Sequence, residues 1–204
     1  LFTHTAHVTA GVPANLTLRW AALLHDTGKV ATFTRDENGR GHFYGHAQKS
    51  AEIADEVLRR LKAPTALREQ AVLLICQHMT PLTPDKKLLR RRVSRLGWDT
   101  LDALLTLQEA DMGGKGAGEA EELDVFPKIR AALAEIRAEN ACLTVKDLAV
   151  NGNDLLALGY EGKAIRETLN ALLEGVLDET LPNERQALLD RAKQRVANGG
   201  ISSE

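Results

Sequence analysis

Residues 16–29 read LTLRWAALLHDTGK, and this stretch decides both the fold and the site. Residues 16–26 are apolar on several sides, which is typical of a buried helix that begins near Asn15 or Thr17. The apolar run ends on His25 and Asp26, and Lys29 follows one turn later. A histidine and an aspartate at the end of an apolar run suit a buried metal site.

The other histidines support this interpretation. All 6 histidines lie between His4 and His78, and the chain after His78 contains none. Helical residues three and four apart share a face, so each of three further polar residues lies at the end of an apolar stripe. His46 continues the stripe of 50, 53, 57 and 61, His78 that of 67, 71 and 74, and Asp111 that of 101, 104 and 108.

Burying these groups without partners would cost several kcal/mol. For a lone histidine, a separate hydrogen bond is the more common solution. One shared divalent metal site would satisfy all of them together, because neutral imidazoles and carboxylates are the natural ligands of Mn, Fe, Ni, Zn or Mg. His7, His42 and Cys76 fit ordinary roles, the two histidines on the surface and the cysteine in core packing.

The composition narrows the class of protein. The 204 residues allow one core plus a small appended bundle, and the low aromatic content of 4% favours helices. Cys76 and Cys142 are too far apart in sequence for a CxxC zinc site, and a reducing, cytoplasmic compartment fits best. No run resembles a membrane span or a signal peptide. The net charge of −2 argues against a protein whose whole surface binds nucleic acid, but it is compatible with a local basic patch. Because the first residue is Leu, we expect a fragment of a longer chain.

Further elements follow from the same patterns. Asn38-Gly39 predicts a small hairpin within residues 31–45. Helices are expected over 46–61, 65–78, 85–96, 100–112 and 119–140, with Gly113 and Gly114 ending the fourth. In the last part, Thr144 with Asp147 has capping-box spacing, Gly159 is a helix C-cap, and Asn183 opens a final helix. Residues 199–204 look frayed.

Several motifs together resemble a known family. The order His4, His25-Asp26, His46, His78, Asp111 is the six-ligand pattern of the HD superfamily of metal-dependent phosphohydrolases. The segments LRWAALLHDTGK, GRGHFYGHAQKSAEIADEVLRRLK, LQEADMGGKG and VNGNDLLALGYEGKAI are similar to the C-terminal half of bacterial CCA-adding tRNA nucleotidyltransferases. Thr27 and Val30 depart from the usual HDIGKP.

This resemblance implies an all-α fold: an HD-domain helical bundle over residues 1–118, with a small β-hairpin, followed by a C-terminal helical extension over 119–198 that supports tRNA. It also implies that the nucleotide-adding chemistry belongs to an N-terminal domain that this chain lacks, because no paired carboxylates on a strand and no Gly-Ser phosphate loop are found. We therefore expect that this chain alone does not add nucleotides.

The resemblance assigns roles as well. His4, His25 and Asp111 would hold one divalent metal (Mn, Ni, Fe, Co, Zn or Mg) together with Asp26, and His46 and His78 would complete a second site that Asp26 bridges. Such a pair would activate water for phosphoester hydrolysis. Asp26 and Lys29 are the expected catalytic residues, with Lys29 offsetting phosphate charge. A solvated lysine at a helix end is an equally good interpretation of Lys29.

Residues 85–95 hold a local concentration of positive charge that could contact an RNA backbone. The candidates are Lys86, Lys87, Arg90, Arg91 and Arg92. A solvated helix face explains the same run.

Two functions from different classes remain open. One is a metal-dependent phosphohydrolase acting on nucleotides or RNA ends, such as 2′,3′-cyclic phosphates, with tRNA as a further partner. The other is a tRNA-binding module of a CCA-adding enzyme, whose HD site does not turn over substrate. The intact ligand set favours the enzyme. The sequence gives no indication of the oligomeric state.

Overall fold

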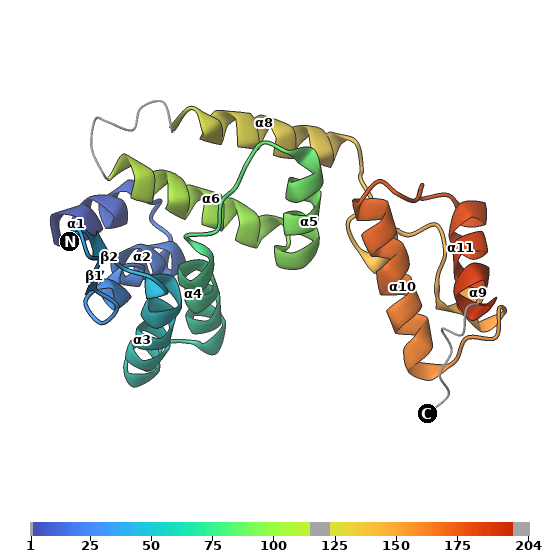
Figure 1. Cartoon of the computed structure of the whole chain (residues 1–204), viewed down its shortest axis with the longest axis horizontal. Helices are drawn as coiled ribbons and strands as arrows, with labels where there is room; N and C mark the ends of the chain where they lie inside the picture. Colours follow the sequence, from blue (N-terminus) through green and yellow to red (C-terminus); the bar gives the residue numbers. More distant parts are fainter. Residues whose placement is uncertain (1, 115–122, 198–204) are drawn as a thin grey trace. The chain divides into compact units, whose positions relative to one another are not determined.

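The computed structural model describes residues 2–114 and 123–197, and Figure 1 shows that its regular structure is helical apart from one short two-stranded hairpin. The predicted all-α HD bundle with a small hairpin is confirmed. The chain divides into two compact units, one made of Leu1–Thr83 and Leu96–Ile129 and the other of Pro84–Arg95 and Arg130–Glu204. Of the helices described, none has the length and hydropathy needed to cross a membrane.

The first unit is a bundle of helices around one apolar core. Helix α1 packs on α2 and α6, α2 also packs on α4, and α3 lies along α4. The core includes Val8, Ala21, Leu58, Leu74 and Leu104. The bounds are α1 (Phe2–Gly11), α2 (Leu16–Leu24), α3 (His46–Arg60), α4 (Thr65–Gln77) and α6 (Trp98–Gly113). The sequence predicted all of these helices except α1.

Just after the end of α2, the backbone of the chain passes close to the backbone of α3. Asn15 caps the start of α2 by accepting the Leu18 N–H at 3.0 Å. His25 and Asp26 follow the helix and precede the 3₁₀ turn η1 (Thr27–Lys29). The Gly28 N–H donates to Ser50 Oγ at 2.8 Å, and a Cβ on Gly28 would lie only 2.5 Å from the His46 carbonyl oxygen. A side chain at position 28 would therefore push η1 away from α3.

The predicted hairpin is present between η1 and α3. Strand β1 (Thr34–Arg35) pairs antiparallel with β2 (Gly41–His42), with Thr34 opposite His42. At the turn, Asp36 Oδ1 accepts the N–H groups of Asn38 and Arg40, and Gly39 takes the left-handed conformation with φ 77°. The hydrogen bond from His42, together with these backbone donors, lowers the pKa of Asp36.

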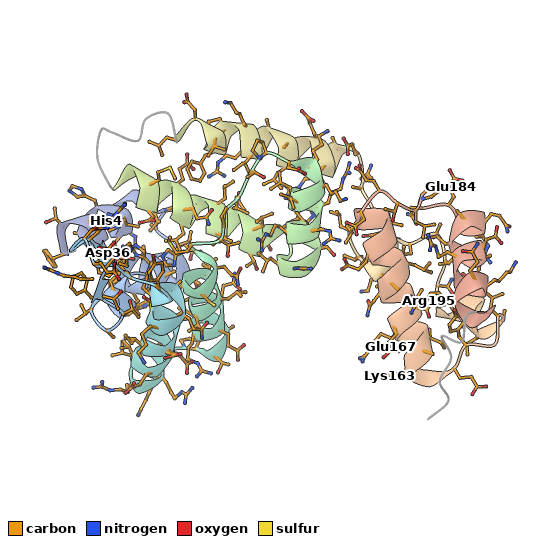
Figure 2. The ribbon with its side chains drawn as sticks, viewed as in Figure 1. His4, Asp36, Lys163, Glu167, Glu184 and Arg195 are labelled. Atoms are coloured by element: carbon orange, nitrogen blue, oxygen red, sulfur yellow. The ribbon has the colours of Figure 1, made fainter. Side chains whose placement is uncertain are left out.

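The second unit carries its own core. Its elements are α5 (Lys86–Leu96), the end of α8 (Val125–Ala138), η3 (Val145–Asp147), α9 (Gly152–Leu156), α10 (Gly162–Leu177) and α11 (Arg185–Ala197). Helix α10 packs on α9 and α11. Leu155, Tyr160 and Leu188 are fully buried there, and the Tyr160 hydroxyl donates to the Ala192 carbonyl at 2.8 Å. On the surface of α10, Lys163 pairs with Glu167 at 2.9 Å (Figure 2).

Most predicted boundaries in this unit agree with the structure. The Thr144–Asp147 capping box is present and Gly159 has φ 86°. Asn183 does not open the last helix: its side chain accepts the Ala149 N–H and donates to the Asp147 carbonyl, both at 2.9 Å, and α11 begins at Arg185. The expected helix over 119–140 is observed as Val125–Ala138.

Some predictions fall outside the described residues. These are the first part of the helix over 119–140, the domain boundary between 118 and 119, and the frayed end at 199–204. The division into 1–118 and 119–198 therefore stays a prediction, although residues 84–95 group with the second unit.

Candidate metal centre

The six predicted ligands converge from distant parts of the first unit. His4 comes from α1 (labelled in Figure 2), His25 and Asp26 from the end of α2, His46 from the start of α3, His78 from the end of α4 and Asp111 from the last turn of α6. Two groups have ligand atoms that all lie within 4.8 Å of one another: His4, His25 and Asp26, and Asp26, His46 and His78. We call these the first triad and the second triad.

Asp26 lies between the two triads and is almost fully buried. Its Oδ2 is 3.4 Å from His25 Nε2 and 3.7 Å from His4 Nε2. Its Oδ1 faces the second triad, 3.5 Å from His46 Nε2 and 4.0 Å from His78 Nε2. Each carboxylate oxygen thus serves one triad.

Asp111 joins the first triad. Its Oδ1 lies 2.8 Å from His4 Nε2 and 3.2 Å from His25 Nε2. Asp111 thus lies beside His4 and His25, and Asp26 lies between the two triads, while the role of these residues as metal ligands stays a prediction.

The four histidines present the same nitrogen to the centre. The Nδ1 atom of each lies within hydrogen-bond distance of a backbone carbonyl: Gly114 for His4 (3.2 Å), Ala22 for His25 (2.7 Å), Phe43 for His46 (2.9 Å) and Ile75 for His78 (2.6 Å). A carbonyl only accepts, so Nδ1 carries the hydrogen and Nε2 keeps its lone pair when the ring is neutral. This arrangement is the usual support for a metal-binding histidine.

The second triad leaves two polar atoms unpaired. His46 Nε2 and His78 Nε2 are buried and have no hydrogen-bond partner among the described residues. An unpaired buried polar atom costs about 1–3 kcal/mol. A divalent cation held with Asp26 would pair both nitrogens, so the donor set fits a metal.

The pKa values of the two deepest histidines are shifted in opposite directions. Burial, assisted by the neighbouring His25 and His46 and opposed by the Ile75 carbonyl and Asp111, lowers the pKa of His78 to about 4, so His78 is neutral at pH 7. Burial alone would also lower the pKa of His25, but its hydrogen bond to Asp111 and the charge of Asp26 together raise that pKa. The acidic neighbours thus draw positive charge into the first triad.

Lys29 lies at the site. Its Nζ is 2.6 Å from Asp26 Oδ2 and 5.8 Å from the centre of the Phe43 ring. It also lines a hollow of about 500 Å³ together with His4, Asp26, Val30, Phe33 and Phe43. A second hollow, of about 540 Å³, shares Lys29 and Phe43 and reaches His46. Both hollows open onto the candidate metal centre.

The stripe predicted for His46 needs a correction. His46 and Ser50 are buried as predicted, but the stripe continues through Ala54 and Leu58, whereas Leu61 is exposed. The buried face of α3 therefore carries Ala51, Ala54 and Leu58 rather than Ile53, Val57 and Leu61, and α4 packs along this helix.

The basic run on α5 is largely neutralised inside the second unit. Lys86 pairs with Glu135 and Glu139, Lys87 with Asp178, Arg90 with Glu139 and Glu179, and Arg91 with Glu174 and Asp178. Arg92 is half-buried on the same helix. An RNA backbone would have to compete with these carboxylates, and the RNA-binding role of α5 stays a prediction.

The remaining singled-out residues have ordinary surroundings. His7 is exposed on α1. His42 is half-buried, bonds to Asp36 at 2.9 Å and stacks on Tyr44. Cys76 packs against the core as predicted, and its Sγ lies 3.2 Å from Gln48 Oε1.

Sequence reasoning missed the aromatic residues at the mouth of the site. Phe33, Phe43 and Tyr44 flank the two short strands of the hairpin, and all three aromatic side chains are exposed. Three aromatic residues around the two strands of a hairpin, in a chain with 4% aromatics, were the available signal.

Comparison with known proteins agrees with this geometry. The HD domain model matches residues 3–111. The A-adding tRNA nucleotidyltransferase of Deinococcus radiodurans is 36% identical over 183 residues, which is 87% of this chain and 42% of that protein. The CC-adding tRNA nucleotidyltransferase of Thermus thermophilus is 33% identical over 175 residues, 85% of this chain and 39% of that protein. The multifunctional CCA protein of Aromatoleum aromaticum is 40% identical over 139 residues, 62% of this chain and 32% of that protein.

The chain spans less than half the length of these relatives. No solved structure matches the chain significantly. The match to the HD model covers more than half of the chain and contains all six converging residues. The chain therefore belongs to the HD domain family.

Proposed function

We propose that this chain is a divalent-metal-dependent phosphohydrolase that acts on nucleotides or RNA ends. The observation that carries the proposal is the pair of triads sharing Asp26, each histidine of which turns a locked Nε2 toward the carboxylate. A protein that only binds RNA has no physical need for two unpaired buried nitrogens.

The ligand assignment follows the geometry. One ion would be held by His4, His25, Asp111 and Asp26, and a second by Asp26, His46 and His78. Bound divalent ions would lower the pKa of water and polarise the phosphate. In the hydrolysis itself, the water oxygen forms a bond to phosphorus, one P–O ester bond breaks, and the leaving oxygen takes up a proton.

The residues of the chain around the ions bind and orient the substrate. Lys29 is the only cation that lines the 500 Å³ hollow among the described residues, and its Nζ lies beside Asp26, so a phosphate oxygen entering from this hollow comes within its reach. A positive charge there offsets the charge that develops on the phosphoryl oxygens. The buried carboxylate of Asp26 in turn fixes the position of Lys29.

A role in tRNA metabolism fits the three relatives described above, which are named for tRNA nucleotide addition or as a multifunctional CCA protein. We propose tRNA, or a nucleotide released from it, as the partner. The alternative is a module that binds tRNA without hydrolysis. The pairing of the α5 charges within the protein gives this alternative little support, because the most basic helix is not free for phosphate.

Metal analysis and hydrolysis assays test the proposal. The purified protein is loaded in turn with Mn²⁺, Ni²⁺, Co²⁺ and Mg²⁺ and offered bis-p-nitrophenyl phosphate and 2′,3′-cyclic nucleotides. We expect bound metal and turnover with at least one ion. Tight tRNA binding without hydrolysis under any metal would favour the alternative.

Two variants locate the activity. Asp26→Asn keeps the shape of the side chain but removes the shared charge, so metal content and turnover should both be lost. Asp55→Asn is the matched control, because Asp55 pairs with Arg59 and Arg68 away from the centre. Lys29→Gln should keep the metal and lower kcat by about 10²- to 10³-fold. Full activity in Asp26→Asn would contradict the site assignment.

A further inference from the structure

Large apolar side chains are exposed together on one side of the candidate metal centre. Val30, Phe33 and Phe43 are 77%, 48% and 39% exposed, and all three line the same hollow as His4 and Asp26. Exposed apolar side chains are normally scattered singly, and a group of them around a concave site marks a binding surface. The proposed hydrolysis does not by itself require this surface.

The two phenyl rings are held in place. Their centres are 5.5 Å apart at an angle of 41°. The Phe33 ring lies directly against Gly41 on the opposite strand, where an added Cβ would come within 2.7 Å of Phe33 Cε2, and the Arg35 guanidinium lies 5.7 Å from its centre. The absence of a side chain at Gly41 therefore makes room for Phe33. The two rings together form an apolar wall of the hollow.

The wall lies next to the charged end of the hollow. Lys29 Nζ links the two, since it is 2.6 Å from Asp26 Oδ2 and 5.8 Å from the centre of the Phe43 ring. A ligand in this hollow would therefore meet positive charge and the candidate metal ligands at one end and aromatic faces at the other. A phosphate joined through a sugar to a flat base has this distribution of charge and apolar surface.

We propose that Val30, Phe33 and Phe43 form a nucleobase subsite, so that the preferred substrate carries a nucleobase on the sugar that bears the reacting phosphate. This inference rests on the proposed function. Stacking on phenyl rings reads no hydrogen-bond pattern and is worth a similar amount for every base. The subsite thus selects nucleotides over other phosphoesters without selecting one base.

A pair of substrates separates the base from the chemistry. Adenosine 2′,3′-cyclic phosphate and glycerol 1,2-cyclic phosphate share the reacting five-membered phosphate ring, but only the first has a base. We expect the wild-type protein to show a much lower KM for the adenosine compound. Phe33→Leu and Phe43→Leu keep apolar volume and remove the flat ring, and each should raise this KM by about 5- to 100-fold with little change in kcat.

The controls use the same substitution and the same reaction. Phe2→Leu changes an exposed phenylalanine that does not line this hollow, and it should leave both KM values unchanged. Hydrolysis of the glycerol compound should be unchanged in Phe33→Leu and Phe43→Leu. Equal KM values for the two substrates in the wild-type protein, or unchanged KM for the adenosine compound in both variants, would overturn the subsite.

A binding measurement keeps the subsite testable without turnover. In saturation-transfer NMR with adenosine 2′-phosphate and Mg²⁺, the adenine protons should receive more saturation than the ribose protons, and this difference should disappear in Phe33→Leu and Phe43→Leu. If no phosphoester is hydrolysed but this pattern is found, the phosphohydrolase proposal fails and the subsite stands. If the adenine protons receive no saturation, the subsite is refuted, whether or not hydrolysis occurs.

Discussion

Replacing His78 with leucine should separate the stability of the first unit from its metal binding. The His78 side chain is buried and its Nε2 has no hydrogen-bond partner among the described residues, so without metal it carries a penalty of about 1–3 kcal/mol. His78→Leu removes this penalty but also loses the hydrogen bond from Nδ1 to the Ile75 carbonyl, worth about 1 kcal/mol. The metal-free variant should therefore be as stable as the wild type, or up to about 2 kcal/mol more stable.

With metal bound, the wild-type protein should be more stable than His78→Leu. A ligand that binds only the folded state at 100 times its Kd stabilises a protein by about 2.7 kcal/mol. For a unit of this size, that gain raises the Tm by on the order of 10 °C. The variant lacks one of the three ligands of the second triad, so its gain from a second ion should disappear.

Tryptophan fluorescence measures this in the intact chain, because both tryptophans, Trp20 and Trp98, belong to the first unit. Thermal unfolding is followed in EDTA and during titration with Mn²⁺ at pH 7, where His78 is neutral because its pKa is lowered to about 4. His7→Leu, at an exposed position on α1, is the control and should keep the full metal shift. A Mn²⁺ shift in His78→Leu equal to that of the wild type, or a loss of more than about 3 kcal/mol in EDTA, would refute the reasoning.

Three further predictions concern single positions. Gly28→Ala places a Cβ 2.5 Å from a backbone oxygen of α3, so it should lower the free energy of unfolding by about 1–3 kcal/mol and weaken metal binding in a Mn²⁺ titration. Gly113→Ala is the control, because the space around its Cβ is open, and it should change neither quantity. Burial raises the pKa of Cys142 to about 11. In a Cys76→Ser background, iodoacetamide at pH 8 should therefore alkylate Cys142 about a hundredfold more slowly in the folded protein than in urea. Equal rates would show that the thiol is not shielded. Because this pKa is raised, the stabilisation linked to the neutral thiol is present below pH 9 and is lost as the pH rises toward 11. Tyr160→Phe removes a buried hydrogen bond to α11 and should lower the free energy of unfolding of the second unit by about 0.5–1.5 kcal/mol in urea titrations followed by circular dichroism, with the tryptophan signal of the first unit unchanged.

Most helices, and the burial of His25, Asp26, His46, His78 and Asp111, could be predicted because both depend on local pattern, whereas His4 was singled out only by the resemblance. The period of the apolar residues predicts each helix. A titratable residue at the end of an apolar stripe is predicted to be buried, whichever element the helix packs against. Helix α1 was missed because FTHTAHVTAG has a weak apolar pattern, several β-branched residues and no capping signal. It is held by Val8, which packs into the core between α2 and α6. Such a contact between distant segments has no local signature.

The same limit explains the basic run and the hairpin. Counting charges on residues 85–95 cannot reveal that Glu139 and Asp178 lie against them. The hairpin turn was predictable from Asn38-Gly39, but the position of its aromatic side chains beside Asp26 was not. Only the fold shows that Phe33 and Phe43 share a hollow with Asp26.

The helix termini explain why these histidines make a preorganised centre. His25 and His78 are the C-caps of α2 and α4, and each donates Nδ1–H to the carbonyl three residues back. The last carbonyls of a helix have no intrahelical partner, so they are free to accept this bond. His46 is fixed in the same way by the Phe43 carbonyl, just before α3 begins. The direction of these Nε2 atoms thus depends on the backbone carbonyls in the last turns of α2 and α4 and just before α3, and no other side chain is needed to hold the rings in place.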